Sequence, residues 1–502
     1  MKEKTIADLN RLHEIDGECR HLEKIAELLN WDAQTYLPPN GHAERAEQLA
    51  VVEGLAHEKF TSGETGELLE AVADDEDLSA IDRDLIHVLK RKYKQDLKLP
   101  LDFVSSSARA QGLSQAAWVK ARQENNFATF LPHLKTMLNF ARKKAEYWGF
   151  TGNRAYDGLL DIYEPDMTAN EVADVFVPLK ERLSLLLKKI AAKPQPETGF
   201  LTKCFPVAEQ KRFCAELMQR LGFDLNRGRL DVSAHPFTCS LGAHDIRITT
   251  RYLEQNPLSS IFSTIHESGH AFYELGLPDS LRGSSLADGA SMAIHESQSR
   301  FWENVIGRSR TFWKFLLPVA QKFFPAQLGG VSLDDFYKAA NQVQPSLIRT
   351  EADEVSYSLH VILRFELERS LFSGELAVEA VPEAWRQGMK DLLDIEPSSD
   401  AEGCLQDIHW SQGSFGYFPS YALGNLYGLQ FRERLLEVIP DFEQQIERGD
   451  FARIHEWLRT HIYSWGKRRS PKDLLEMICE QKLSSKPFID YIEEKYSSLY
   501  GL

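Results

Sequence analysis

The segment TIHESGHAFYE, residues 264–274, carries the side chains with the clearest potential for chemistry. His266 and His270 are four residues apart, and residues four apart lie on the same face of an α-helix. Two imidazoles presented in this way can bind one Zn²⁺ ion with bonds of about 2.0–2.1 Å. Glu267 is the next residue around the helix, where its carboxylate can accept a hydrogen bond from a water molecule on that ion. These three residues therefore predict a hydrolytic metal site.

The alternative interpretation of this segment is a solvated helix face that carries two histidines and a glutamate. Apolar residues around the motif, among them Ile261, Phe262 and Phe272, indicate instead that the helix is buried. Histidines and a glutamate buried without partners would be costly, so a bound metal explains them better. The His-Glu-x-x-His pattern is typical of zinc peptidases, in which the glutamate is the general base, and we predict this role for Glu267.

A second segment, MAIHESQSRF at residues 292–301, can supply the third protein ligand that a catalytic zinc site needs. Two histidines and one glutamate are a known catalytic ligand set, and Glu296 is the candidate glutamate. His295 points about 100° away from Glu296 on a helix, so we expect it to pack or to hydrogen-bond to a ligand without binding the metal. Arg300 lies four residues after Glu296 and can hold its carboxylate. The alternative is that Glu296 is a solvated acid paired with Arg300.

Helices must position these residues, and helical periodicity dominates the chain. It predicts a helix over residues 259–277 and a second helix from about Ser291, joined by a connection rich in Gly, Ser and Pro. Alternating apolar residues and clustered β-branched residues predict a strand or hairpin within 229–253. The proline-containing segment 191–200 either separates a helical N-terminal part from the rest or forms a surface loop. Other predicted helices cover residues 85–97, 101–126 and 131–150. We therefore expect a mainly α-helical protein with one small β-sheet.

The composition of the 502-residue chain is that of an ordinary globular protein, with 43% hydrophobic and 26% charged residues. A net charge of −16 argues against nucleic acid as a partner, because phosphate recognition needs clustered Lys and Arg. No apolar run is long enough for a membrane span, and no apolar stretch follows the charged N-terminus as in a secretory signal. The six cysteines are scattered without a CxxC pair, which favours reduced thiols and a cytoplasmic location. We expect one catalytic domain over residues 1–502, with a helical part over about 1–190 and the metal and substrate site within about 200–502.

Six motifs, in a fixed order along the chain, carry a resemblance to a known family. They are HPF (235–237), DIRIT (245–249), HESGH (266–270), HESQSR (295–300), IRTEADE (348–354) and GCLQDIHW (403–410). Two earlier stretches, LLNWDAQTYLPP (28–39) and YDGLLDIYEPDMT (156–168), extend the resemblance over nearly the whole chain. The set resembles the carboxypeptidase Taq family of zinc metallocarboxypeptidases, and the metal-binding positions agree with it.

The resemblance implies a single large α-helical body with a long, deep substrate groove and the metal at its floor, similar to angiotensin-converting enzyme and the neurolysin-type peptidases. It also implies a homodimer that releases single amino acids from peptide C-termini, with broad side-chain preference and poor handling of C-terminal proline. In this family Zn²⁺ supports activity, and Co²⁺ can substitute for it.

Peptide hydrolysis also needs a donor for the oxyanion that develops beside the metal. His409 in QDIHW is one candidate, and Tyr417 or Tyr421 in SFGYFPSY is the other. The aromatic, glycine-broken stretch 413–421 is expected to form a loop over the groove. Ordinary packing is the alternative for all three residues.

A carboxypeptidase must recognise a free terminal carboxylate, and arginine does so with a planar fork of donors. Arg349 in IRTEADE is the first choice, and Arg247 in DIRIT is the second because a strand beside the metal could also hold the peptide backbone. The alternative for either arginine is a structural ion pair, for Arg349 with the acids at 351–354, which could equally support a metal-binding histidine. His235 in HPF resembles a backbone-binding histidine of related peptidases, although a lone histidine is more often structural.

Two other functions are compatible with these motifs. A zinc endopeptidase or oligopeptidase would use the same metal and Glu267 but would not need an arginine for a terminal carboxylate. A non-catalytic binding protein with a structural zinc is the second alternative, but a structural site usually has four protein ligands, often cysteines.

The negative net charge also predicts weaker cleavage of peptides that end in Asp or Glu.

Overall fold

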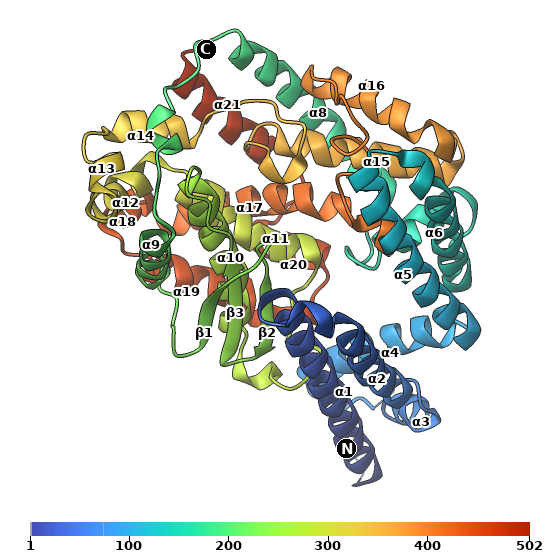
Figure 1. Ribbon diagram of the computed structural model, residues 1–502. Coiled ribbons are helices and arrows are strands. Elements are labelled where there is room, and N and C mark those ends of the chain that lie inside the picture. Colours follow the sequence, from blue (N-terminus) through green and yellow to red (C-terminus); the bar gives the residue numbers. More distant parts are fainter. Residues whose placement is uncertain (1–2, 74) are drawn as a thin grey trace.

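The computed structural model describes residues 3–73 and 75–502, and most of these residues are α-helical (Figure 1). The helices before the sheet are α1 (Glu3–Thr35), α2 (His42–Phe60), α3 (Gly63–Val72), α4 (Ala80–Leu97), α5 (Leu101–Glu124), α6 (Phe127–Trp148), α7 (Ala155–Leu160), α8 (Ala169–Ala191) and α9 (Val207–Arg220). The helices after the sheet are α10 (Pro257–Gly276), α11 (Met292–Arg300), α12 (Arg310–Phe323), α13 (Pro325–Leu328), α14 (Leu333–Ala340), α15 (Tyr357–Ser373), α16 (Val381–Leu393), α17 (Phe418–Val438), α18 (Phe442–Arg448), α19 (Ala452–His461), α20 (Pro471–Cys479) and α21 (Lys486–Tyr500). The mainly α-helical prediction is confirmed, and the three helices predicted from periodicity before residue 151 correspond to α4, α5 and α6.

A small three-stranded sheet forms where alternation of residue types predicted a strand or hairpin. Its strands are β1 (Gly228–Val232), β2 (Thr238–Gly242) and β3 (Asp245–Thr250). The central strand β3 pairs in parallel with β1 and antiparallel with β2. Ile246 and Ile248 of β3 are fully buried in the core that also contains apolar residues of α10. The sheet therefore lies beside the helix that carries the HESGH motif (Figure 1).

The main hydrophobic core extends across the proline-containing segment 191–200. Side chains from α8 before it, such as Leu183, and from α9 after it, such as Phe213, belong to the same core. The segment is thus a surface connection, the second of the two interpretations of the sequence. A smaller core joins α1–α4 to Leu281 and Leu286, which lie between α10 and α11. The assignment of residues 1–502 to a single catalytic domain stays a prediction.

Glycines allow α10, α11 and α17 to approach one another closely. A Cβ atom at Gly269 of α10 would lie 2.6 Å from the Ser299 Cα of α11. A Cβ atom at Gly424 of α17 would lie 2.6 Å from the Glu296 Cγ, also on α11. Real Cβ contacts are longer than this, so any larger residue at either position would force its neighbours to move. The two helices that carry the HES segments are therefore in direct backbone contact.

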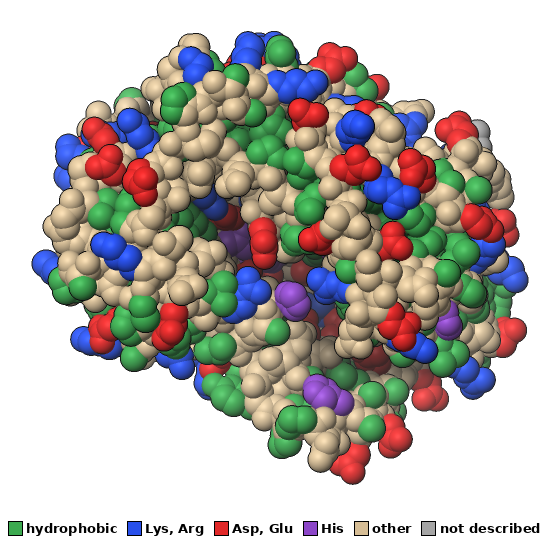
Figure 2. Space-filling view, turned by 45° about the horizontal axis from the view of Figure 1, so that its top comes forward, with side chains coloured by type: hydrophobic (Ala, Val, Ile, Leu, Met, Phe, Trp, Pro, Cys, Tyr) green, Lys and Arg blue, Asp and Glu red, His purple; other side chains and the backbone are tan. Residues whose placement is uncertain are grey.

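One face of the molecule is hollowed, and histidine and acidic side chains are visible within the hollow (Figure 2). This shape agrees with the predicted groove. The further likeness to angiotensin-converting enzyme and neurolysin-type peptidases stays a prediction. Within the described residues, no helix combines the length and apolar character that a membrane crossing requires.

Candidate active site

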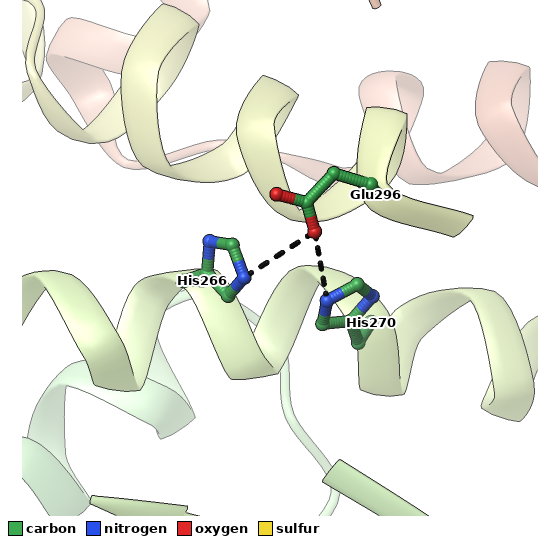
Figure 3. Close-up of side chains that lie close together, drawn as sticks. All are labelled: His266, His270 and Glu296. Carbon is green, nitrogen blue, oxygen red and sulfur yellow. Dashed lines mark ion pairs between the residues drawn. The ribbon is translucent and has the colours of Figure 1, made fainter. Parts of the chain in front are cut away.

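His266, His270 and Glu296 converge between α10 and α11 (Figure 3). The Glu296 Oε2 lies 3.6 Å from the His266 Nε2 and 3.4 Å from the His270 Nε2. Ligand atoms around a tetrahedral ion with bonds of about 2.0–2.1 Å are roughly 3.3–3.4 Å apart, so these separations fit a shared zinc ion better than direct hydrogen bonds. The donor set of two imidazoles and one carboxylate also suits a catalytic metal, and these residues can hold one.

The local structure of the two helices explains why these side chains meet. His266 and His270 follow one another by a helical turn on α10, as their spacing predicted. The helix α11 begins after Ser291, whose side chain accepts a hydrogen bond from the Ile294 N–H at 3.1 Å. This cap sets the start of the short helix and so determines the direction in which Glu296 points.

Arg300 holds the Glu296 carboxylate, as its spacing predicted. The Arg300 Nε donates to the Glu296 Oε1 at 2.7 Å, and the Ser299 hydroxyl donates to Oε2 at 3.0 Å. Burial alone would raise the pKa of the Glu296 carboxyl, but Arg300 and the two histidines hold it well below its usual range. The side chain of Glu296 is only 8% exposed, which excludes the alternative of a solvated acid. The carboxylate is thus charged and fixed, as a metal ligand must be.

Glu303 supports His266, and the sequence reasoning missed it. It lies on the π-helix η5 (Phe301–Gly307), which continues α11, and its Oε2 is 2.9 Å from the His266 Nδ1. Arg300 and Arg308 each contact Glu303 at 3.1 Å and keep its pKa below the usual range against the effect of burial. A proton on Nδ1 leaves the His266 Nε2 free for a metal. Glu303 follows Glu296 by seven residues, a spacing that places both side chains on one face of a helix. This spacing was the signal in the sequence that could have identified Glu303.

His270 is supported through a second histidine. Its Nδ1 lies 2.6 Å from the His295 Nδ1, and the His295 Nε2 lies 2.9 Å from the Glu274 Oε1. Of the two roles expected for His295, packing or a hydrogen bond to a metal-binding residue, the structure has the hydrogen bond, to the candidate ligand His270. Burial lowers the pKa of His270 to about 4, so its imidazole is neutral near pH 7. A neutral imidazole is the form that binds a metal.

Glu267, the predicted base, is anchored by the β-sheet. The Thr238 hydroxyl on β2 donates to the Glu267 Oε2 at 2.6 Å. Only 5% of Glu267 is exposed, and burial raises the pKa of its carboxyl. Thr238 directly follows the HPF motif (235–237), and nothing in the sequence alone connected it to Glu267. One oxygen of the carboxylate is thus held by the sheet, and no hydroxyl among the described residues donates to the other.

Arg349 is buried in an ion-pair cluster next to aromatic side chains. Its Nε and Nη2 contact the Asp407 Oδ1 at 3.1 and 2.9 Å, and the Arg364 Nε contacts the other Asp407 oxygen at 2.6 Å. The Arg349 guanidinium also lies 4.6 Å from the centre of the Tyr421 ring. The sequence suggested the acids at 351–354 as alternative partners, whereas Asp407 of QDIHW is the observed one. Two guanidinium groups thus share one carboxylate.

His409 and the two candidate tyrosines form one aromatic group. The His409 Nε2 lies 3.2 Å from the Tyr421 hydroxyl, and the Tyr417 and Tyr421 rings are 5.1 Å apart. Burial lowers the pKa of His409 to about 3 and raises that of Tyr421, so both side chains are neutral near pH 7. The expected loop over 413–421 is partly wrong, because α17 begins at Phe418 and Tyr421 lies on it. Proline at the second position of α17 favours this helix start.

Arg247 points to the face of the sheet that meets α1. It alternates along β3 with the buried Ile246 and Ile248, so its side chain lies on the opposite face. There its guanidinium lies 4.2 Å from the centre of the Trp31 ring and contacts Asp245 at 2.8 Å. The structural ion pair considered as the alternative for this arginine therefore exists.

His235 is exposed in the connection between β1 and β2. Hydrogen bonds to the Thr249 hydroxyl shape this connection, from the Ser233 hydroxyl at 2.7 Å and from the Phe237 N–H at 2.9 Å. The HPF and DIRIT motifs thus belong to one structural unit. His235 is accessible to a ligand at its surface.

The mainly α-helical fold and the His-His-Glu cluster beside a buried glutamate define a metallopeptidase of the His-Glu-x-x-His class. Comparison with known proteins narrows this class. Residues 11–496 match the family described as carboxypeptidase Taq (M32) metallopeptidase, and the chain belongs to this family. The resemblance of its motifs is therefore confirmed, and the protein is a metallocarboxypeptidase.

Relatives and solved structures of the family match almost the full chain. Carboxypeptidase 1 of Bacillus subtilis is 40% identical over 484 residues, which cover 96% of each chain. Thermostable carboxypeptidase 1 of Thermus thermophilus is 40% identical over 510 residues, with 99% of each chain covered. The crystal structure of the M32 carboxypeptidase from Deinococcus radiodurans R1 has a TM-score of 0.97 at 38% identity and covers 99% of this chain and 100% of that one.

Proposed function

We propose that the protein is a zinc-dependent carboxypeptidase that releases single amino acids from peptide C-termini, with broad side-chain preference and weak action on C-terminal proline. The observation that carries the metal and base assignments is the cluster of His266, His270 and Glu296, with ligand-atom separations of 3.4 and 3.6 Å, directly beside the buried Glu267. The substrate preferences rest on the family resemblance.

His266, His270 and Glu296 would hold the zinc ion, and Co²⁺ is proposed as a substitute. When bound, the ion supplies Lewis acidity, which lowers the pKa of water to about 7 and polarises the scissile carbonyl group. Three protein ligands leave an open position, as catalytic rather than structural sites do. This ligand number argues against the non-catalytic alternative.

Glu267 acts as the general base and then as the general acid. It takes a proton from the attacking water and delivers it to the leaving amine. The hydrogen bond from Thr238 fixes one carboxylate oxygen, so the other can face the water. Burial raises the pKa of Glu267, which brings its proton affinity closer to that of a base working near pH 7.

Arg349 binds the terminal carboxylate of the substrate, and Tyr421 with His409 stabilises the oxyanion. Arg349 and Arg364 share the single carboxylate of Asp407, so the cluster has one positive charge in excess. A substrate carboxylate would balance that charge. The Tyr421 hydroxyl remains protonated and can donate, and its contact with His409 favours it over Tyr417. Arg247 is the weaker choice for the carboxylate, because its single positive charge is already balanced by the single carboxylate of Asp245.

The Glu267→Gln variant tests the base. It should bind zinc like the unchanged protein and lose peptide hydrolysis by a factor of about 100 or more. Glu366→Gln, which alters a surface carboxylate paired with Lys180, is the matched control and should keep full activity. Hydrolysis at the normal rate by Glu267→Gln would contradict the assignment.

A pair of substrates separates the carboxypeptidase from the endopeptidase alternative. A peptide with a free C-terminus should be cleaved much faster than the same peptide with a C-terminal amide, and only single residues should be released. Equal rates, or cuts within the peptide, would favour an endopeptidase. A homodimer is also proposed from the family resemblance, and a cytoplasmic location from the scattered cysteines. Sedimentation of the purified protein tests the dimer.

A further inference from the structure

One ring nitrogen of His270 turns away from Glu296 (Figure 3). This nitrogen, Nδ1, faces the imidazole of His295. The two Nδ1 atoms of His270 and His295 are 2.6 Å apart, and the His295 Nε2 is 2.9 Å from the Glu274 Oε1. All three residues are partly exposed, with 18% of the His270 side chain, 19% of the His295 side chain and 10% of the Glu274 side chain accessible. The contacts form one continuous line from a carboxylate to the metal position.

Only one arrangement of protons in this chain of hydrogen bonds leaves the His270 Nε2 free to bind a metal. A single proton can lie between the two Nδ1 atoms, and a metal on the His270 Nε2 requires that proton to be on His270. His295 must then accept at Nδ1 and carry its own proton on Nε2, which donates to Glu274. In the reverse arrangement His270 would carry its proton on Nε2, where the metal should bind. Glu274 therefore selects the His270 tautomer that can bind a metal, and it acts through two successive hydrogen bonds.

We propose that His295 and Glu274 are positioning residues that set the tautomer and the ring orientation of His270 for metal binding. This proposal rests on the proposed metal site. Glu303 contacts His266 directly, whereas Glu274 acts on His270 through the interposed imidazole of His295.

The helices keep the three side chains in register. Glu274 lies four residues after His270 on α10, so one rigid helix carries both the ligand and the carboxylate. The His295 ring is confined between neighbours, because the Tyr273 ring is 5.1 Å away and a Cβ atom at Gly289 would lie 3.0 Å from the His295 Cδ2. Confinement of this kind fixes the ring plane, which a hydrogen bond alone does not.

The test measures zinc affinity of the metal-free protein by competition with a chelator, together with the thermal unfolding midpoint of each metal-free variant. His295→Leu removes the acceptor and should weaken zinc binding about 10- to 100-fold. His295→Asn can place an amide oxygen near the position of Nδ1 and should recover most of that loss. Glu274→Gln loses the charge that favours the Nε2 proton and should weaken zinc binding by a smaller factor.

Glu366→Gln is the control, because it makes the same change from acid to amide as Glu274→Gln at a surface carboxylate that pairs with Lys180. It should bind zinc like the unchanged protein. A zinc affinity of His295→Leu equal to that of the unchanged protein would overturn the proposal. So would a loss in His295→Asn as large as in His295→Leu, or unchanged affinity in Glu274→Gln.

If His295→Leu does not fold, the Asn and Gln variants still decide the outcome. The proposed metal site has a separate test, since His270→Ala must itself lose zinc affinity. Full affinity in His270→Ala would refute the site, whereas loss there with full affinity in His295→Leu would refute the positioning role alone.

Discussion

Replacing Gly424 of α17 with alanine should pull Glu296 away from the metal position. The added Cβ would lie 2.6 Å from the Glu296 Cγ and 2.8 Å from its Cβ. Carbon atoms in contact prefer separations of about 3.5–4.0 Å, so the two helices or the Glu296 side chain must move by about 1 Å. Metal sites hold their ligand distances to about 0.2 Å, which is much less than this displacement.

Gly424→Ala should lower the free energy of unfolding only modestly and should weaken zinc binding clearly. Overpacking in a core costs about 1–3 kcal/mol, while alanine favours a helix over glycine by about 1 kcal/mol. The net destabilisation of the metal-free protein is therefore at most about 2 kcal/mol. Loss of the correct Glu296 position should weaken zinc binding about 10- to 100-fold and slow peptide hydrolysis by a similar factor.

The assay compares zinc affinity, hydrolysis and the unfolding midpoint of Gly424→Ala with those of Gly112→Ala. Gly112 lies on α5, and a Cβ atom there would meet nothing within 4 Å. This control should be slightly more stable than the unchanged protein and should bind zinc normally. Full zinc affinity and full activity in Gly424→Ala would refute the inference that Glu296 is a ligand held by close helix packing.

Three other expected outcomes concern substrate recognition, pH and metal. Arg349→Lys keeps the charge but loses the planar fork, so kcat/KM for a peptide with a free C-terminus should fall about 10- to 100-fold, whereas an equal loss on the amide would contradict the assignment. Burial raises the pKa of the fully buried Glu164 from 4.5 to about 7, so the folded state binds this proton more tightly than the unfolded chain does. Its contribution to stability is present below about pH 4.5 and is lost by about pH 7, a change of up to roughly 3 kcal/mol. Glu164→Gln should therefore raise the unfolding midpoint of the metal-free protein near pH 8 but not near pH 4, and the opposite order would contradict this sign. Zinc at about 1,000 times its dissociation constant should stabilise the metal-free protein by about 4 kcal/mol, and an unchanged midpoint on zinc addition would count against the metal site.

Local periodicity made the centre of the site predictable from the sequence. Because α-helix geometry is local, a spacing of four residues is enough to place His266 and His270 on one face and Arg300 beside Glu296. The alternation of residues in 229–253 predicted the sheet for the same reason. The ordered motifs also predicted the family, which the match over residues 11–496 confirms.

Contacts between distant segments were decided by the tertiary structure alone. The partner of Arg349 is Asp407, and the support for Glu267 is Thr238, and each pair is far apart in the sequence. Spacing cannot predict such pairs, because they depend on how helices and strands pack. The same limit applied to Tyr421, which a glycine-broken pattern assigned to a loop and which lies on α17.

The two HES segments show most clearly which features the sequence determined and which the tertiary structure decided. From its sequence alone, TIHESGHAFYE determined two imidazoles and an adjacent carboxylate on one helix, since those positions follow from the helical repeat. That Glu296 of the second segment lies beside His266 and His270, and that His295 hydrogen-bonds to His270, was decided by the direct contact of α10 with α11. The contact requires a glycine at position 269, and its consequence for the neighbouring side chains exists only in the folded protein.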